Sequence, residues 1–175
     1  GGYRPLVAMN VACSGLAISA KKEEWERLGG ENPRLRAGMG RMWELFSDAP
    51  VLGSLIDPTR DPPDPMFTAG FDEISPALER ALQLQAANDA PDHHEEVVAA
   101  RGVSEASLLL SKRYHLIATN VPYLGSVGHC DTLRDFAATY FSAAKSDLAT
   151  VMLSRIFSLL AERGHQALVT SQNWW

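Results

Sequence analysis

The chain has 175 residues, 46% hydrophobic and 21% charged, which is the composition of an ordinary globular domain with its own core. Its formal net charge of −5 argues against a protein whose whole surface wraps nucleic acid, because phosphate neutralisation needs a basic face, although a local basic patch is compatible with it. No apolar run approaches the roughly 20 residues of a membrane-spanning helix and no signal peptide opens the chain, so we expect a soluble, cytoplasmic protein without a membrane partner.

The cysteines and the chain ends bear on the redox environment of the protein and on whether the chain is part of a larger domain. Cys13 and Cys130 lie far apart and do not form a disulfide framework, so we expect free thiols in a reducing cytoplasm. The chain starts at Gly1 without a Met and ends in the apolar pair Trp174-Trp175, which would be exposed at a free terminus. We therefore expect an excised piece of a larger domain.

The N-terminal region is predicted to be largely helical. The apolar run from Arg4 to Ala12 is compatible with a short strand, and residues Lys21 to Leu28 favour a short charged helix with Trp25 on its apolar side.

A second helix is predicted from Glu31 to Ala49. Asn32-Pro33 provides a capping residue followed by Pro at the first helical position, and Pro50 is expected to end the helix. Apolar residues at three- and four-residue spacing predict a buried stripe: Leu35, Met39, Met42 and Phe46, with Trp43 and Leu45 beside them.

The middle of the chain is predicted as a loop followed by helices. Asp57 to Pro65 is too rich in Pro for a helix or a central strand. Ser75-Pro76 is expected to open a helix that reaches about Asn88, and Asp89 to Glu96 to form an acidic turn. Helical character resumes from Glu95 to Arg113, and Gly102 could break it.

The sequence His93-His94-Glu95-Glu96 raises the question of a metal site. Consecutive helical residues point in different directions, and neither His has a second His four residues later. We interpret the segment as a solvated charged turn and expect no metal.

The character of the chain changes at Tyr114. Tyr114 to Thr119 is an apolar run of strand length that ends in Asn120-Val121-Pro122-Tyr123 and a Gly-rich loop. This pattern places the tetrapeptide at the carboxyl end of a strand, which is where open α/β sheets bind ligands.

Two helices and a strand are predicted after this loop. Asp131 is expected to cap a helix from Thr132 to Phe141, and Ser146 to cap one from Asp147 to Arg163 that Gly164 closes. The second helix has a broad apolar face predicted to be buried: Leu148, Val151, Met152, Ile156, Phe157, Leu159 and Leu160.

The last predicted element is a strand from Gln166 to Thr170. The order strand–helix–helix–strand is a crossover unit, so we expect two parallel strands with a right-handed connection.

The region from Ile117 to Gly125 closely resembles the Asn-Pro-Pro-Tyr loop of amino-methyltransferases. Lys145-Ser146-Asp147-Leu148 and the segment from Ala167 to Trp174 resemble the segments after that loop in large adenine-specific (N6) DNA methyltransferases of type IIG restriction–modification and BREX phage-defence systems. A looser similarity extends upstream through Asn10 to Leu16 and Leu52 to Ile56.

This resemblance implies a fold and a division of the chain. The fold would be α/β, part of a Rossmann-like methyltransferase domain with a largely helical insertion before the strand that carries the motif. Residues 1–113 would form the helical region, and residues 114–175 the strand–helix–helix–strand segment of the catalytic core.

The resemblance also implies roles for the motif residues. The substrate would be duplex DNA with a flipped adenine, whose N6 amine is a poor nucleophile until two acceptors hold it. The side-chain oxygen of Asn120 would be one acceptor and the main-chain carbonyl of Val121 the other. Tyr123 would stack on the base, and Pro122 would keep the loop extended.

The chain departs from the family pattern in two ways. Val121 stands where the family usually has Pro, which removes one fixed backbone angle but keeps the carbonyl. S-adenosylmethionine is the implied cofactor, yet the usual Gly-rich cofactor loop is missing: Asn10 to Gly15 has one Gly where that loop needs Gly-x-Gly. The cofactor-binding residues are therefore unknown, and we expect weak or no cofactor binding by the chain alone.

Three functions remain open. The first is a fragment of an S-adenosylmethionine-dependent adenine-N6 DNA methyltransferase, which could work with other restriction or defence-system subunits. The second is a non-catalytic interaction or regulatory module on a methyltransferase-like scaffold, which the acidic charge, Val121 and the missing loop favour. The third is methylation of another planar amine, on RNA or on a protein glutamine.

Overall fold

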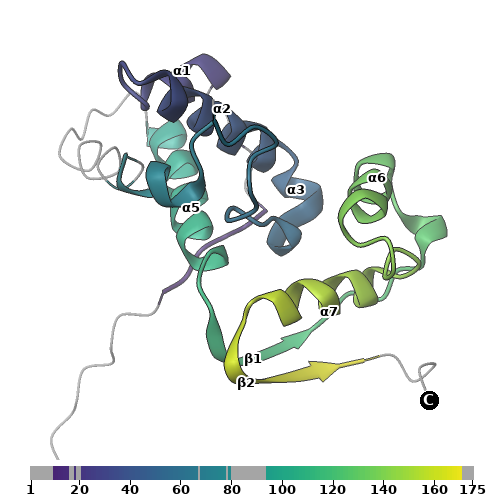
Figure 1. Cartoon of the computed structure of the whole chain (residues 1–175). Coiled ribbons are helices and arrows are strands. Elements are labelled where there is room, and N and C mark those ends of the chain that lie inside the picture. The colour runs from purple at the N-terminus through teal and green to yellow at the C-terminus, as the bar shows by residue number, and fades with distance from the viewer. Residues whose placement is uncertain are drawn as a thin grey trace, which may run out of the picture.

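A computed structural model describes residues 10–15, 18, 21–66, 68–77, 79 and 94–170 of the chain, with only the backbone described over 94–101. A helical part comes first, and a strand–helix–helix–strand part comes second (Figure 1). The elements are α1 (Lys22–Arg27), α2 (Pro33–Ser47), α3 (Ala49–Leu52), the 3-10 helix η1 (Gly53–Leu55), α5 (His94–Leu110), β1 (Tyr114–Asn120), the 3-10 helix η3 (Ser126–Gly128), α6 (Asp131–Tyr140), α7 (Leu148–Ser158) and β2 (Leu160–Val169). The described part is therefore a mixed α/β structure, as predicted.

Both predicted N-terminal helices are present. Trp25 of α1 is buried, and α2 starts where its capping residue predicts, because the Oδ1 atom of Asn32 accepts hydrogen bonds from the backbone N–H groups of Arg34 (3.0 Å) and Leu35 (3.4 Å). The prediction that Pro50 ends this helix was wrong, since α2 ends at Ser47 and Pro50 lies in the first turn of the short α3. Pro is tolerated there because the first turn leaves its N–H groups unpaired.

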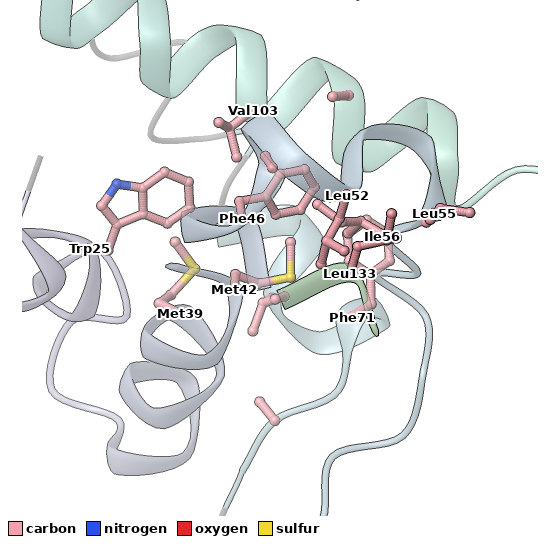
Figure 2. Packing of buried hydrophobic residues seen from close by; sticks show 14 of the residues in the cluster. Trp25, Met39, Met42, Phe46, Leu52, Leu55, Ile56, Phe71, Val103 and Leu133 are labelled. Atoms are coloured by element: carbon pink, nitrogen blue, oxygen red, sulfur yellow. The ribbon is translucent and has the colours of Figure 1, made fainter. Parts of the chain in front are cut away.

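The hydrophobic core gathers around α2. Met39, Met42 and Phe46 are fully buried, which confirms the predicted stripe (Figure 2). The cluster also takes side chains from α1, α3, η1 and α5, and reaches Leu133 of α6 and Val151 of α7. One continuous core therefore joins the helical part to the helices that come after β1.

Gly38 and Gly40 of α2 offer a matched test of this packing. A Cβ added at Gly38 would lie 2.9 Å from the backbone oxygen of Ala69 and 2.8 Å from a methyl group of Ile74, whereas at Gly40 it would meet the flexible side chains of Glu26 and Lys22. We expect Gly38→Ala to lower the free energy of unfolding by about 1–3 kcal/mol through overpacking. Gly40→Ala should be neutral or stabilising, because Ala is the better helix former. Urea unfolding of the two variants measures the difference, and equal stabilities would contradict it.

The middle of the chain agrees with the prediction in part. Residues 57–65 form neither helix nor strand, and α5 runs through Gly102 without the break considered from the sequence. Residues 71–77 are helical, so this helix begins before Ser75-Pro76, where the sequence predicted its start. The remainder of that helix, most of the acidic turn and residues 4–9 of the first predicted strand lie outside the described residues, and residues 10–12 are not in a strand.

The C-terminal helix is shorter than predicted. Its cap is Asp147, not Ser146, with Oδ1 accepting from the N–H of Ala149 at 2.7 Å, and α7 ends at Ser158. The carbonyl of Leu159 instead accepts the N–H of Tyr114, which starts the strand pairing early (2.9 Å). Phe157 was expected in the buried face but is 70% exposed.

Gly164 therefore does not close a helix but lies in an irregular stretch of β2. The strand register shifts here, since Tyr114 pairs with Leu160 and Leu116 with His165. A Cβ on Gly164 would lie 2.9 Å from the backbone oxygens of Tyr114 and Ala161, so the close approach requires glycine.

The two strands are parallel neighbours, as predicted, and α7 lies along one face of the sheet (Figure 1).

Cys13 and Cys130 are both free and exposed, which agrees with the prediction that they form no disulfide framework. Among the described helices, none has the length and apolar character that crossing a membrane requires. The N-cap of α6 is Cys130 and not Asp131, which is the first helical residue.

Candidate functional site

The motif loop leaves the carboxyl end of β1. Asn120 is the last residue of the strand and pairs with Val169 of β2, so the residues after it extend beyond the sheet edge. Because both strands run in the same direction, the loop and the end of β2 lie at one edge. This is the edge at which parallel α/β sheets bind ligands.

Burial divides the tetrapeptide into an anchor and an exposed pair. Val121 is 3% exposed and packs with Ala149 and Ile156 of α7 in a small hydrophobic cluster. Asn120 is exposed, and Tyr123 is 47% exposed. The branched side chain of Val121 thus holds the loop against α7, while the two polar side chains face solvent.

The exposed side chains of Asn120 and Tyr123 contact each other. The Tyr123 hydroxyl donates to the Asn120 side-chain oxygen at 3.4 Å, a long hydrogen bond between exposed groups. The carboxamide oxygen is therefore held by a weak bond that another donor could replace. The four successive residues thus hold a side-chain amide oxygen and an aromatic ring in contact through the tyrosine hydroxyl.

The loop after the motif is tied to the start of α7. The carbonyl of Leu124 accepts the N–H of Leu148 at 2.8 Å, and the N–H of Ser126 donates to the carbonyl of Ser146 at 2.9 Å. Gly125 and Asp147 form an isolated antiparallel bridge. The segment Lys145 to Leu148, selected from the sequence only by resemblance, is therefore in direct contact with the motif loop.

Sequence reasoning missed His129, which lies beside the motif loop. Its ring is 2% exposed and its Nε2 atom lies 3.0 Å from the Leu124 carbonyl. Arg134 holds the His129 backbone through a hydrogen bond to its carbonyl at 2.8 Å. A single His in a Gly-rich loop belongs to no sequence pattern. Only its burial and its contact with the Leu124 carbonyl in the folded chain reveal it.

Sequence reasoning also missed Arg155, a buried charge in α7. Its guanidinium donates to the carbonyls of Ser54 (3.3 Å), Ile56 (2.8 Å) and Leu110 (3.0 Å), and forms an ion pair with Asp57 at 3.4 Å. Burial lowers the pKa of Arg155, and the carboxylate of Asp57 offsets part of that effect. This one side chain joins the helical part to α7, the helix against which the motif loop packs.

Other features of the described chain do not extend the site. A cavity of about 760 Å³ is lined by α2, the 57–68 loop and α6, and contains no residue of the motif loop. No group of three or more metal-ligating side chains occurs among the described residues. His93 and the side chains of residues 94–96, considered for metal binding, lie outside the described part of the chain, as do residues 171–175 of the resembling segment.

No protein-family model matches the chain. Over 134 residues, or 77% of its length, the chain is 32% identical to the adenine-specific methyltransferase BrxX of Escherichia coli O9:H4 (strain HS). Over 87 residues, or 50% of its length, it is 34% identical to the adenine-specific methyltransferase PglX of Lacticaseibacillus casei (strain Zhang). The matched regions are 10% and 7% of those proteins, so the chain spans about a tenth of their length. The resemblance predicted from the motif is thereby confirmed.

Proposed function

We propose that this chain, which resembles a segment of the adenine-specific methyltransferases BrxX and PglX, is the part of a DNA adenine-N6 methyltransferase that holds the target base. We propose further that this protein has a Rossmann-like domain, uses S-adenosylmethionine and acts in restriction or phage defence. The observation that carries it is the exposed pair Asn120 and Tyr123 at the carboxyl end of β1, held by a buried Val121.

The residue types of the motif suit a planar amine. An extruded adenine could donate its two N6 hydrogens to the Asn120 side-chain oxygen and the Val121 carbonyl. These bonds would favour a more tetrahedral nitrogen with a more available lone pair. Stacking on Tyr123 would hold the ring in place. The aromatic contact requires the exposure that Tyr123 has.

Cofactor binding is not assigned to residues of this chain. Residues 10–15 do not provide a Gly-x-Gly turn, so they do not fit the cofactor loop of such enzymes. In the enzymes it resembles, S-adenosylmethionine supplies the electrophilic methyl group. We place its binding loop elsewhere in the protein that contains this chain.

The alternative function is a non-catalytic module on the same scaffold. The net charge of −5 and the Val in place of the first Pro favour it. The exposure of Asn120 and Tyr123 favours the catalytic function instead, because a purely structural loop gains nothing from leaving them in solvent.

Methylation by the whole protein separates these functions. Plasmid DNA prepared from cells without adenine methylation should gain N6-methyladenine when incubated with the protein and S-adenosylmethionine, as measured by mass spectrometry of the nucleosides. Methylation of RNA or of a protein glutamine, with none on DNA, would replace the DNA substrate. No transfer to any of them would support the non-catalytic module.

Variants of Tyr123 test the stacking contact. Tyr123→Ala is expected to reduce kcat/KM for DNA roughly 5- to 150-fold, the factor that corresponds to the ~1–3 kcal/mol of one base-stacking contact. Tyr123→Phe keeps the ring and loses only the 3.4 Å bond to Asn120, so its kcat/KM should stay close to wild type. Similar losses for both variants would show that the hydroxyl matters and the stacking does not.

A further inference from the structure

His129 is a buried imidazole that the proposed chemistry does not use directly. Its ring is 2% exposed, and its Nε2 atom lies 3.0 Å from the carbonyl oxygen of Leu124. Because that oxygen can only accept, Nε2 must carry the proton. The Nδ1 atom is buried without a hydrogen-bond partner among the described residues.

An unpaired buried nitrogen is unfavourable for stability. An apolar side chain of similar size would fill the same space without that penalty. The imidazole therefore gives the loop something that packing alone does not, and its one hydrogen bond is the feature that an apolar residue lacks.

That hydrogen bond reaches Leu124, the residue that follows Tyr123. The Leu124 carbonyl accepts two hydrogen bonds, one from the N–H of Leu148 at the start of α7 and one from His129. Both donors fix the peptide between Leu124 and Gly125, one residue beyond Tyr123. The ring of His129 is itself fixed, since η3 ends at its backbone and Arg134 donates to its carbonyl at 2.8 Å.

We propose that His129 is a positioning residue for the target-base loop. Its Nε2–H donates a hydrogen bond to the Leu124 carbonyl, and we call this bond the clamp. By fixing Leu124, the clamp sets the position of the Tyr123 ring relative to Asn120. The inference rests on the proposed function for its target-base role, while the clamp itself is a property of the loop.

The clamp is tested by two substitutions in the whole protein. His129→Leu fills the space without a donor, and His129→Gln places an amide donor near the Nε2 position. Amide hydrogen exchange of peptides covering residues 120–128 should be faster in His129→Leu than in wild type and close to wild type in His129→Gln. Unchanged exchange in His129→Leu would overturn the inference, whatever the catalytic results.

The catalytic readout uses adenine-unmethylated plasmid DNA. His129→Leu should lower kcat about 3- to 10-fold, the size expected for one neutral positioning hydrogen bond, and leave KM for S-adenosylmethionine unchanged. His129→Gln should recover most of that loss. If both variants lose kcat equally and have a lowered Tm, His129 contributes only to packing, and the inference is overturned. Inactive wild-type protein would remove the proposed function and the target-base role, while the exchange result would still decide the clamp.

Discussion

Replacing Asn120 with Ala in the whole protein is expected to lower kcat for adenine methylation by about 100- to 1000-fold, as when one preorganised hydrogen-bonding group is removed from an active site. The substitution deletes the side-chain acceptor that would hold the N6 amine. Because Asn120 is exposed and its carboxamide makes, among the described residues, a single long bond of 3.4 Å to Tyr123, the fold should be unaffected. Steady-state methylation of plasmid DNA gives kcat, and thermal unfolding gives the stability.

Asn120→Asp is the matched control for this prediction. Asp keeps an oxygen acceptor in the same place, so this variant should retain more activity than Asn120→Ala. Wild-type kcat in Asn120→Ala would remove Asn120 from the chemistry, and a lowered Tm in that variant would mean that the side chain has a structural role.

Replacing Arg155 with Met is expected to lower the free energy of unfolding by about 3–5 kcal/mol, the range for breaking a buried ion pair by removing one partner. Met matches the length of the aliphatic part, so packing is largely kept. The loss comes from Asp57 and from the carbonyls of Ser54, Ile56 and Leu110, which would be left without their donor. Urea or thermal unfolding of the chain measures it.

Two further variants separate geometry from charge. Arg155→Lys keeps the charge but has a single ammonium, which cannot reach three carbonyls and a carboxylate at once, so most of the loss should remain. Lys22→Met removes an exposed ion-pair partner of Glu44 and should change stability little. Arg155→Met as stable as wild type would mean that the core alone joins α7 to the helical part.

The candidate site was predictable where local chemistry decides it. An apolar strand followed by Asn120-Val121-Pro122-Tyr123 places the motif at a sheet edge, and the structure has Asn120 as the last residue of β1. The packing of Val121 against α7 and the clamp by His129 were not predictable, because both depend on residues from later elements.

Helix ends and long-range contacts were decided by tertiary structure. Leu159 to Arg163 read as good helix, yet α7 stops at Ser158 because the Leu159 carbonyl pairs with Tyr114 of β1. Helix propensity describes a residue in isolation, and a hydrogen bond to a neighbouring strand outweighs that small preference.

By itself the sequence determined the periodic stripe of α2, its cap at Asn32 and the strand before the motif, since each depends on residues close along the chain. The parallel pairing followed from the order of the elements, strand–helix–helix–strand. Only the folded chain decided that Arg155 of α7 would contact both residues 54–57 and Leu110, and that Leu124 would accept from two donors. The physical reason is that a buried polar group needs partners, and which distant groups supply them is settled by packing.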